Sequence, residues 1–244
     1  MTNQKGALIL SHLQQEGSCT LGGLLIERGM RVRTINSPRT WKEKGLAHID
    51  PLRPDLLIIM GGPIGVYQAD DYPFLHDEMA ILKARLAADL PTIGICLGSQ
   101  LMAQAMGSTV RKGEAGKEVG WKGLTLTEAG KSSPAAHLCE SKTSMFHWHG
   151  DTYDLPAGAT RLASTDQYEN QIYTIGKAAL GLQCHPEVCR RPLEEWFVMF
   201  NGDITGAAPL IPVDELRKQT DAKIETLNKQ ATLFFGEWLD EVGL

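Results

Sequence analysis

The sequence predicts an α/β fold: a three-layer sandwich in which helices flank a mostly parallel central sheet, with a smaller antiparallel extension. Two observations favour this fold. In the first hundred residues, short apolar segments of strand character alternate with helical patterns, the order expected of a parallel sheet with right-handed crossovers. In the middle of the chain, strand-like segments follow one another between Gly, Pro and Asp turn signals, which indicates an antiparallel or mixed extension of the sheet.

The first elements are short and clearly bounded. Ala7–Leu10 is an apolar run of strand character, and Thr20–Arg28 has a helical pattern that Gly29 should end. Arg31–Ile35 alternates as a strand does. Asp55–Met60 contains a continuous apolar run, which is typical of a strand buried on both faces.

The remaining elements follow the same rules. A helix is expected over residues 73–88, with Leu75, Met79, Leu82 and Leu86 on one stripe. Five further strands are expected at Val119–Leu126, Thr143–His147, Thr160–Thr165, Gln171–Ile175 and Ala178–Gln183. Two helices should close the chain, at Pro192–Asn201 and at about Val213–Val242. The last carries apolar residues between charges, as a helix packed on the domain would, although a partner-binding or dimer helix is an alternative.

Composition excludes several classes of protein. The chain has 244 residues, 43% hydrophobic and 22% charged, as expected for a globular protein. Its net charge of −5 argues against nucleic-acid binding through bulk electrostatics. One local basic cluster is interrupted by Glu114 and Glu118, and we interpret it as a solvated loop rather than a docking surface; its members are Arg111, Lys112, Lys117 and Lys122.

The N-terminus and the cysteines indicate the compartment. The chain shows no signal-peptide pattern and no apolar stretch long enough to span a membrane, so no membrane association is expected. Five cysteines, an odd number, predict free thiols in a reducing, cytoplasmic setting.

Cys96 lies in the segment PTIGICLGSQ (residues 91–100), where a strand-like run leads into a Gly-x-Cys-x-Gly turn and then a helical pattern. The two glycines allow a sharp turn from strand to helix where a side chain would clash. Cys96 should therefore lie at a helix N-terminus, where free backbone N–H groups and the helix dipole favour a thiolate and stabilise an oxyanion. We interpret Cys96 as a nucleophile; a buried structural cysteine is the alternative.

A cysteine nucleophile needs a base, and the base needs an orienting acceptor. His185 follows an apolar strand-like segment in GLQCHPE (residues 181–187), so its imidazole should lie at a strand end, as Cys96 does. Glu187 lies two residues further on, beyond a proline, and can accept a hydrogen bond from one ring nitrogen. The alternative is that His185-Pro186-Glu187 forms a solvent-exposed turn without a catalytic role.

A third motif also follows a buried strand. Gly61-Gly62-Pro63 comes directly after the apolar run that ends at Met60. Glycines at a strand end let the backbone approach a ligand and leave an N–H group free to bind it. A plain turn explains the motif equally well when it is taken alone.

Together, these three motifs in this order resemble the class I glutamine amidotransferase domain. The resemblance extends to about residue 200 and is strongest to stand-alone members related to the amidotransferase half of GMP synthetase. Residues 61–75 and the segment FHWHGD (residues 146–151) favour that narrower placement. The resemblance implies a flavodoxin-like fold, with the amidotransferase domain over residues 1–205 and a C-terminal helical extension, packed on the same domain, over residues 206–244.

The resemblance also implies a role for each matching residue. Cys96 would attack the side-chain carboxamide of glutamine to give a thioester and ammonia, His185 would relay the proton, and Glu187 would orient His185. The backbone N–H groups of Gly62 and Leu97 would form the oxyanion hole. The implied substrate-binding residues are Gln100, Trp148, Gly150 and Asp151. No metal and no cofactor is expected.

The fate of the nitrogen is left open. GMP synthetase carries an ATP-pyrophosphatase segment after its amidotransferase domain, and no such segment and no P-loop motif follows here. The expectation is therefore either that ammonia passes to a separate synthase subunit or that the protein is a free-standing hydrolase.

Three other functions remain as alternatives. A γ-glutamyl peptidase would use the same triad and release an amine or peptide. A metal-binding or regulatory protein would use the cluster of Cys184, His185 and Cys189, or His147 and His149 on one strand face. A degenerate amidotransferase would serve as an interaction module.

Overall fold

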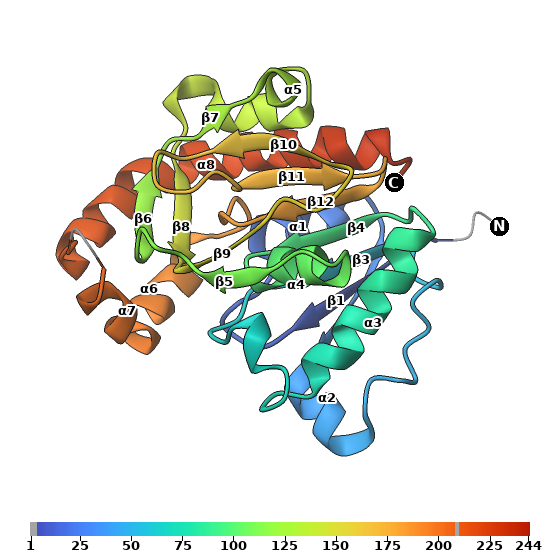
Figure 1. Ribbon diagram of the computed structural model, residues 1–244. Helices are drawn as coiled ribbons and strands as arrows, with labels where there is room; N and C mark the ends of the chain where they lie inside the picture. Colours follow the sequence, from blue (N-terminus) through green and yellow to red (C-terminus); the bar gives the residue numbers. More distant parts are fainter. Residues whose placement is uncertain (1–3, 208–209) are drawn as a thin grey trace.

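The structure, a computed structural model, describes residues 4–207 and 210–244, and its centre is an eight-stranded sheet (Figure 1). Five neighbouring strands are parallel, in the order β2 (Arg31–Asn36), β1 (Gly6–Ser11), β3 (Leu56–Ile59), β4 (Thr92–Ile95) and β12 (Ala179–Leu182). Three antiparallel strands extend the sheet beyond β12: β11 (Ile172–Ile175), β10 (Ala159–Ser164) and β7 (Thr125–Leu126). The predicted fold class is confirmed.

Helices cover both faces of this sheet because its central strands are apolar on both faces. In β3, Leu56 and Ile58 pack into the core that includes α1 (Cys19–Glu27) and α8 (Val213–Glu241). Leu57 and Ile59 pack into a second core, with α3 (Phe74–Ala87) and α4 (Leu97–Ala105). All four side chains are fully buried. Alternate residues of a strand point to opposite faces, so a continuous apolar run requires two helical layers.

The parallel half agrees closely with the sequence prediction. Helix α1 ends where Gly29 was expected to end it: Gly29 has φ +74°, and the amides of Gly29 and Met30 bond to the carbonyls of Ile26 and Leu25. Helix α2 (Ser37–Lys44) was missed, although the Asn36 side chain caps it by accepting from the Arg39 amide at 3.0 Å.

The middle of the chain differs from the prediction. The single strand expected over 119–126 is wrong, because Gly123 and Leu124 separate β6 (Glu118–Lys122) from β7, and the two lie in different sheets. Strand β6 pairs with β8 (Met145–His149), and β5 (Val110–Lys112) pairs with β9 (Asp151–Tyr153), as two small antiparallel sheets outside the main one.

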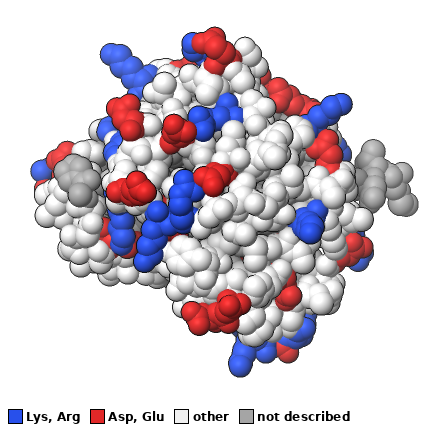
Figure 2. Space-filling model, viewed as in Figure 1, with Lys and Arg blue, Asp and Glu red and all other residues white. Residues whose placement is uncertain are grey.

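The basic cluster is therefore not a loop throughout. Arg111 and Lys112 lie in β5. Three of the four side chains are ion-paired: Arg111 with Asp154, Lys117 with Asp203, and Lys122 with Glu118. In the view of Figure 2, basic and acidic side chains are interspersed over the surface.

The C-terminal helices pack on the same domain. α6 (Arg190–Met199) and α7 (Asn201–Thr205) are short, whereas α8 spans 29 residues and buries an apolar stripe in the core it shares with α1. Trp121 Nε1 donates to Thr220 Oγ1 at 3.0 Å, which ties β6 to α8. The domain boundary at residues 205/206 stays a prediction. Among the described residues, no helix has both the length and the apolar character needed to cross a membrane.

Candidate active site

The three motifs meet at one edge of the sheet. Strands β3, β4 and β12 are parallel neighbours, so their carboxyl ends lie side by side, where ligands commonly bind in α/β folds. Gly61-Gly62 follows β3, Cys96 follows β4, and His185 follows β12. All of these motifs contribute residues to the wall of one cavity of about 450 Å³.

Cys96 occupies the strand-to-helix elbow in a conformation that few side chains adopt, with φ +50° and ψ −107°. Its amide bonds to the Leu182 carbonyl at 2.7 Å, and its carbonyl accepts from the amide of Ser99 at 3.0 Å. These bonds hold the strained residue in place. The side chain is 8% exposed, and Sγ contacts the Trp148 carbonyl at 3.8 Å.

The flanking glycines are required by close packing. A Cβ on Gly98 would lie 2.1 Å from the carbonyl oxygen of Ile59, and one on Gly94 would lie 2.5 Å from the carbonyl oxygen of Gly98. Helix α4 therefore begins directly against β3 and β4, as the Gly-x-Cys-x-Gly pattern predicts.

His185 and Glu187 form a buried pair. Glu187 Oε1 lies 2.8 Å from His185 Nδ1, and neither residue is more than 2% exposed. The Nδ1–H group donates to the carboxylate, which leaves Nε2 for the thiol. Nε2 makes no complete hydrogen bond within residues 4–207 and 210–244. Catalytic hydrogen bonds are often this loose without a substrate.

The charge around His185 favours the imidazolium. Burial would lower the pKa of His185, but the Glu187 carboxylate and the nearby Cys96 sulfur raise it well above 6.5. Trp196 packs edge-on against the ring, with 5.1 Å between centroids. The arrangement is that of a cysteine beside a histidine whose ring is oriented by a carboxylate.

Two backbone amides can serve as oxyanion donors. His12 Nδ1 donates to the Gly61 carbonyl at 2.6 Å. Because the peptide is trans, the Gly62 N–H points away from His12. The Leu97 amide is the first of α4, where no intrahelical acceptor exists. Neither amide has another backbone acceptor among the described residues.

His12 is itself fixed by a network that the sequence did not reveal. His12 Nε2 lies 3.0 Å from Glu78 Oε2, and Ser37 Oγ donates to Glu78 Oε1 at 2.5 Å. Burial would lower the pKa of His12, but Glu78 raises it, so both ring nitrogens can donate. This network holds the Gly61–Gly62 peptide in one orientation.

The four predicted substrate-binding residues also line the cavity: Gln100, Trp148, Gly150 and Asp151. Gln100 Nε2 donates to Gln183 Oε1 at 3.0 Å, and Trp148 Nε1 donates to Asp203 Oδ2 at 3.0 Å. Burial raises the pKa of Asp151, which accepts from Tyr67. The structure brings these side chains together; their roles in binding stay a prediction.

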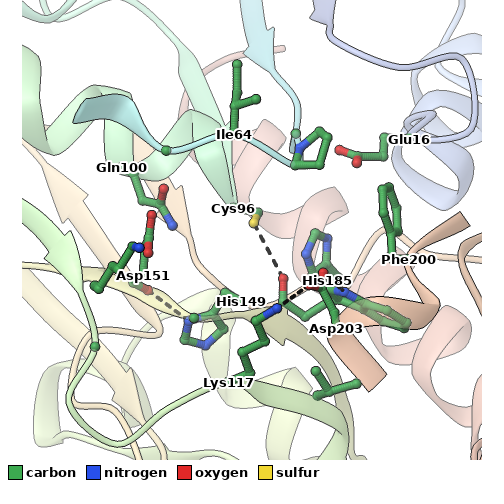
Figure 3. Close-up of a pocket in the computed structure, with 18 of the residues that line it drawn as sticks. Glu16, Ile64, Cys96, Gln100, Lys117, His149, Asp151, His185, Phe200 and Asp203 are labelled. Carbon is green, nitrogen blue, oxygen red and sulfur yellow. Dashed lines mark hydrogen bonds and ion pairs between the residues drawn. The ribbon is translucent and has the colours of Figure 1, made fainter. Parts of the chain in front are cut away.

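Several cavity residues were missed by the sequence interpretation. They are Glu16, Lys117, Trp196, Phe200 and Asp203. Figure 3 shows Gln100 and Asp151 on one side of Cys96 and Glu16 and Phe200 on the other. Glu16 follows β1, a neighbour of β3, so its place after a parallel strand was a usable signal.

Comparison with known proteins assigns the chain to a family. The family model described as glutamine amidotransferase class-I matches residues 23–201, most of the chain. This chain belongs to the class I glutamine amidotransferase family. The family supports glutamine amidotransferase activity.

Individual relatives agree with this assignment. The chain is 35% identical over 136 residues to a putative glutamine amidotransferase-like protein, YfeJ, of Salmonella typhimurium, covering 54% of this chain and 56% of that one. It is 38% identical over 144 residues to the GMP synthase of Corynebacterium jeikeium, covering 57% of this chain and 25% of that one. The matches thus span about half of YfeJ and a quarter of the synthase. The predicted resemblance to these proteins is confirmed.

Solved amidotransferase structures superpose over nearly the whole chain. A glutamine amidotransferase from Thermotoga maritima gives a TM-score of 0.83 at 26% identity, covering 99% of this chain and all of that one. A second, from Methylobacillus flagellatus, gives a TM-score of 0.84 at 25% identity, covering 98% of this chain and 96% of that one.

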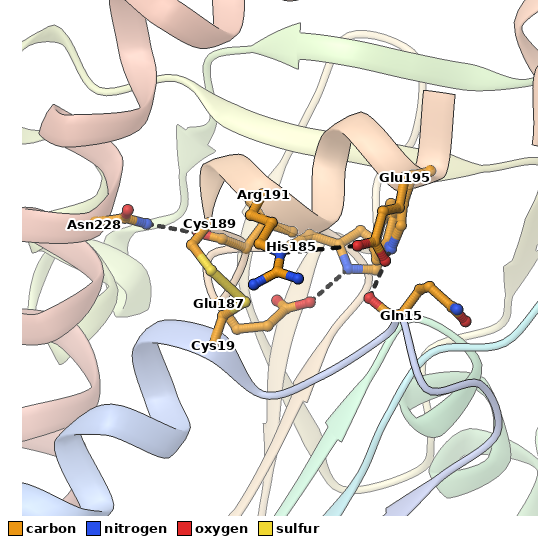
Figure 4. Close-up of a disulfide and its surroundings, with 10 residues drawn as sticks. Gln15, Cys19, His185, Glu187, Cys189, Arg191, Glu195 and Asn228 are labelled. Atoms are coloured by element: carbon orange, nitrogen blue, oxygen red, sulfur yellow. Dashed lines mark hydrogen bonds and ion pairs between the residues drawn. A yellow bond between two sulfur atoms is a disulfide. The ribbon is translucent and has the colours of Figure 1, made fainter. Parts of the chain in front are cut away.

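A disulfide lies close to the His185–Glu187 pair (Figure 4). Cys19, the first residue of α1, is bonded to Cys189, two residues after Glu187, with 5.9 Å between their Cα atoms. The Thr20 amide bonds to the Glu187 carbonyl at 3.0 Å, so two links join α1 to the turn that carries Glu187. The expected free thiols are present at Cys96, Cys139 and Cys184, but not at Cys19 and Cys189, because an odd count requires only one free cysteine. The cytoplasmic location stays a prediction.

We expect the disulfide to be measurable in solution. Titration of the unreduced, denatured protein should find three thiols, those of Cys96, Cys139 and Cys184. Cys19→Ser should lower the free energy of unfolding in urea by about 2–4 kcal/mol, because the bond constrains the unfolded chain. Cys139→Ser is the matched control and should not change it by that amount. Five titratable thiols would contradict the bond.

Of the two metal-binding clusters suggested by the sequence, the structure brings only one together. Cys184, His185 and Cys189 are not brought together, since Cys189 is in the disulfide and His185 faces Glu187. His147 and His149 do share a face, and their ligand atoms lie within 4.8 Å of one another and of Glu118.

In this second cluster, Glu118 and His149 are already hydrogen-bonded, whereas neither ring nitrogen of His147 makes a hydrogen bond in the described part of the chain. Glu118 accepts from His149 at 2.9 Å, Gln171 at 2.6 Å and Thr165 at 2.8 Å. Burial would raise the pKa of Glu118, but hydrogen bonding and the histidine charges lower it to about 2. Burial lowers the pKa of His147 to about 3. We interpret the cluster as a polar network joining β6 to β8.

Proposed function

We propose that this chain hydrolyses the side-chain amide of glutamine, or of a close γ-glutamyl amide, through a thioester on Cys96. The observation that carries the proposal is the geometry. Cys96 on its strained elbow, His185 and Gly62 border one cavity, while the buried Glu187 bonds to His185 and the Leu97 amide directly follows Cys96. These are the parts that acyl transfer requires.

The reaction takes two steps in this geometry. The Cys96 thiolate attacks the γ-carbonyl carbon, and the developing oxyanion is held by the Gly62 and Leu97 amides. The C–N bond breaks as His185 Nε2 gives its proton to the leaving nitrogen. Neutral His185 then removes a proton from water, which attacks the thioester, releases glutamate and regenerates the thiol. Glu187 orients His185 throughout.

The released ammonia could serve a separate synthase subunit. GMP synthases among the relatives are named as glutamine-hydrolysing, and the present chain matches only a quarter of the first of them. We propose such a subunit as a partner. The alternatives of a metal-binding protein or a degenerate interaction module find less support, because Cys96 lies at the elbow and Glu187 bonds to His185.

Covalent trapping tests the proposal. A diazoketone analogue of glutamine should add one mass increment to the protein, located by peptide mass spectrometry at Cys96. Cys139 is an internal control, since it is a free thiol that is less buried than Cys96 and has no catalytic partners. Cys96→Ser should not be labelled. Equal labelling of Cys139, or of the Cys96→Ser variant, would contradict the proposed nucleophile.

The leaving group separates a glutaminase from a γ-glutamyl peptidase. Both share the thioester, so the deciding measurement compares ammonia release from glutamine with amine release from γ-glutamyl peptides. The cavity volume of about 450 Å³ lies in the range that takes ligands larger than free glutamine.

A further inference from the structure

The cavity continues past the nucleophile on the side of the leaving group. In the proposed reaction, His185 protonates the departing nitrogen, so that nitrogen lies on the His185 side of Cys96. The cavity wall on this side includes Glu16, Trp196 and Phe200. Figure 3 shows Glu16 and Phe200 across Cys96 from Gln100 and Asp151.

Glu16 comes close to the reacting groups. A Cβ placed on Gly61 would lie 2.8 Å from Glu16 Oε2 and 3.5 Å from both Cys96 Cβ and His185 Cε1. The three side chains therefore converge on one point, which only a glycine leaves free. Glu16 also has no part in the two steps of the proposed mechanism.

Glu16 differs from the other acidic groups of the cavity. Asp203 is paired with Lys117, and Asp151 has Lys112 and Lys117 as nearby positive charges. Glu16 is 5% exposed, and its carboxylate makes no hydrogen bond or ion pair in the described part of the chain, so the positive charges near it, on His185 and His12, act without direct contact. A buried carboxylate without a partner is costly, and a cation removes that cost.

We propose that Glu16 forms a subsite for a positively charged leaving amine, so that the preferred substrates are γ-glutamyl amides of amines carrying a second, cationic nitrogen. This inference rests on the proposed thioester chemistry. Trp196 and Phe200 line the same part of the cavity, and aromatic rings favour a cation beside them. Burial raises the pKa of Glu16 to about 7, and a bound ammonium group would favour its charged form.

The test compares two substrates that differ in a single positive charge. Two substrates differ only at the end of the amine: γ-glutamyl-1,4-diaminobutane ends in an ammonium group, and γ-glutamyl-n-pentylamine ends in a methyl group. The wild-type protein should favour the charged substrate about tenfold in kcat/KM, and in Glu16→Gln this ratio should fall to about one. Because the readout is a ratio, a general loss of activity does not imitate the result.

The control is Glu225→Gln, an exposed glutamate on α8, which should keep the wild-type ratio. A ratio near one in the wild type, an unchanged ratio in Glu16→Gln, or turnover of glutamine without turnover of either amide would overturn the Glu16 subsite. Failure of the proposed function gives another result, since then neither glutamine nor the two amides are hydrolysed and the diazoketone does not label Cys96.

Discussion

Cys96→Ala is expected to lower kcat/KM for the substrate by on the order of 10⁴-fold or more while the fold stays intact. Without the sulfur no thioester can form, and the remaining amide donors can only assist direct attack by water. The structural cost should be small, because alanine keeps the Cβ at this position and the hydrogen bond from the Cys96 sulfur to the Trp148 carbonyl, at 3.8 Å, is weak. The thermal midpoint should therefore stay within a few degrees of wild type.

The measurement is the initial rate of glutamate release at substrate concentrations below KM, with Cys139→Ala as the control that should keep wild-type rates. A second variant tests whether Cys96 and His185 act as a unit. His185→Asn should cause a loss of similar size, and the double variant should lose little more than either single one, since groups in one relay are not additive. If Cys96→Ala kept a tenth of the wild-type rate, a thioester could not be the main route.

The parallel half of the fold could be predicted from the sequence, because each local apolar pattern there is consistent with only one kind of element. Residues 56–59 are apolar at every position, which requires helices on both faces of the sheet. The antiparallel half was less predictable. Alternation identifies a strand but not its partner, so nothing local showed that residues 118–122 pair with 145–149 outside the main sheet.

The site was predictable for a related reason. Its three motifs each follow a strand, and the carboxyl ends of parallel neighbours meet at one edge. Contacts between distant segments were not predictable. The Cys19–Cys189 bond joins residues that are 170 positions apart in the sequence. The His12–Glu78 contact, which fixes the Gly61–Gly62 peptide through His12, joins residues that are 66 positions apart. No rule of sequence spacing predicts such pairs, because only the folded chain brings their residues together.

Gly98→Ala is expected to destabilise the fold by about 3 kcal/mol or more, the largest stability effect of the variants considered. The added Cβ would lie 2.1 Å from the carbonyl oxygen of Ile59 and 2.8 Å from its carbonyl carbon. These are backbone atoms of a central strand, fixed by pairing on both sides, so helix α4 must move away instead. That movement would displace the Leu97 amide and weaken the oxyanion site.

Gly23→Ala is the matched control, since it too replaces a helical glycine, in α1, and its Cβ would meet nothing within 4 Å. Alanine favours a helix over glycine, so this variant should be stabilised by about 0.5–1 kcal/mol. Urea unfolding of both variants should therefore give shifts of opposite sign. Equal midpoints for Gly98→Ala and wild type would mean that α4 does not begin directly against β3. The position of the Leu97 amide beside Cys96, which depends on that contact, would then lose its support.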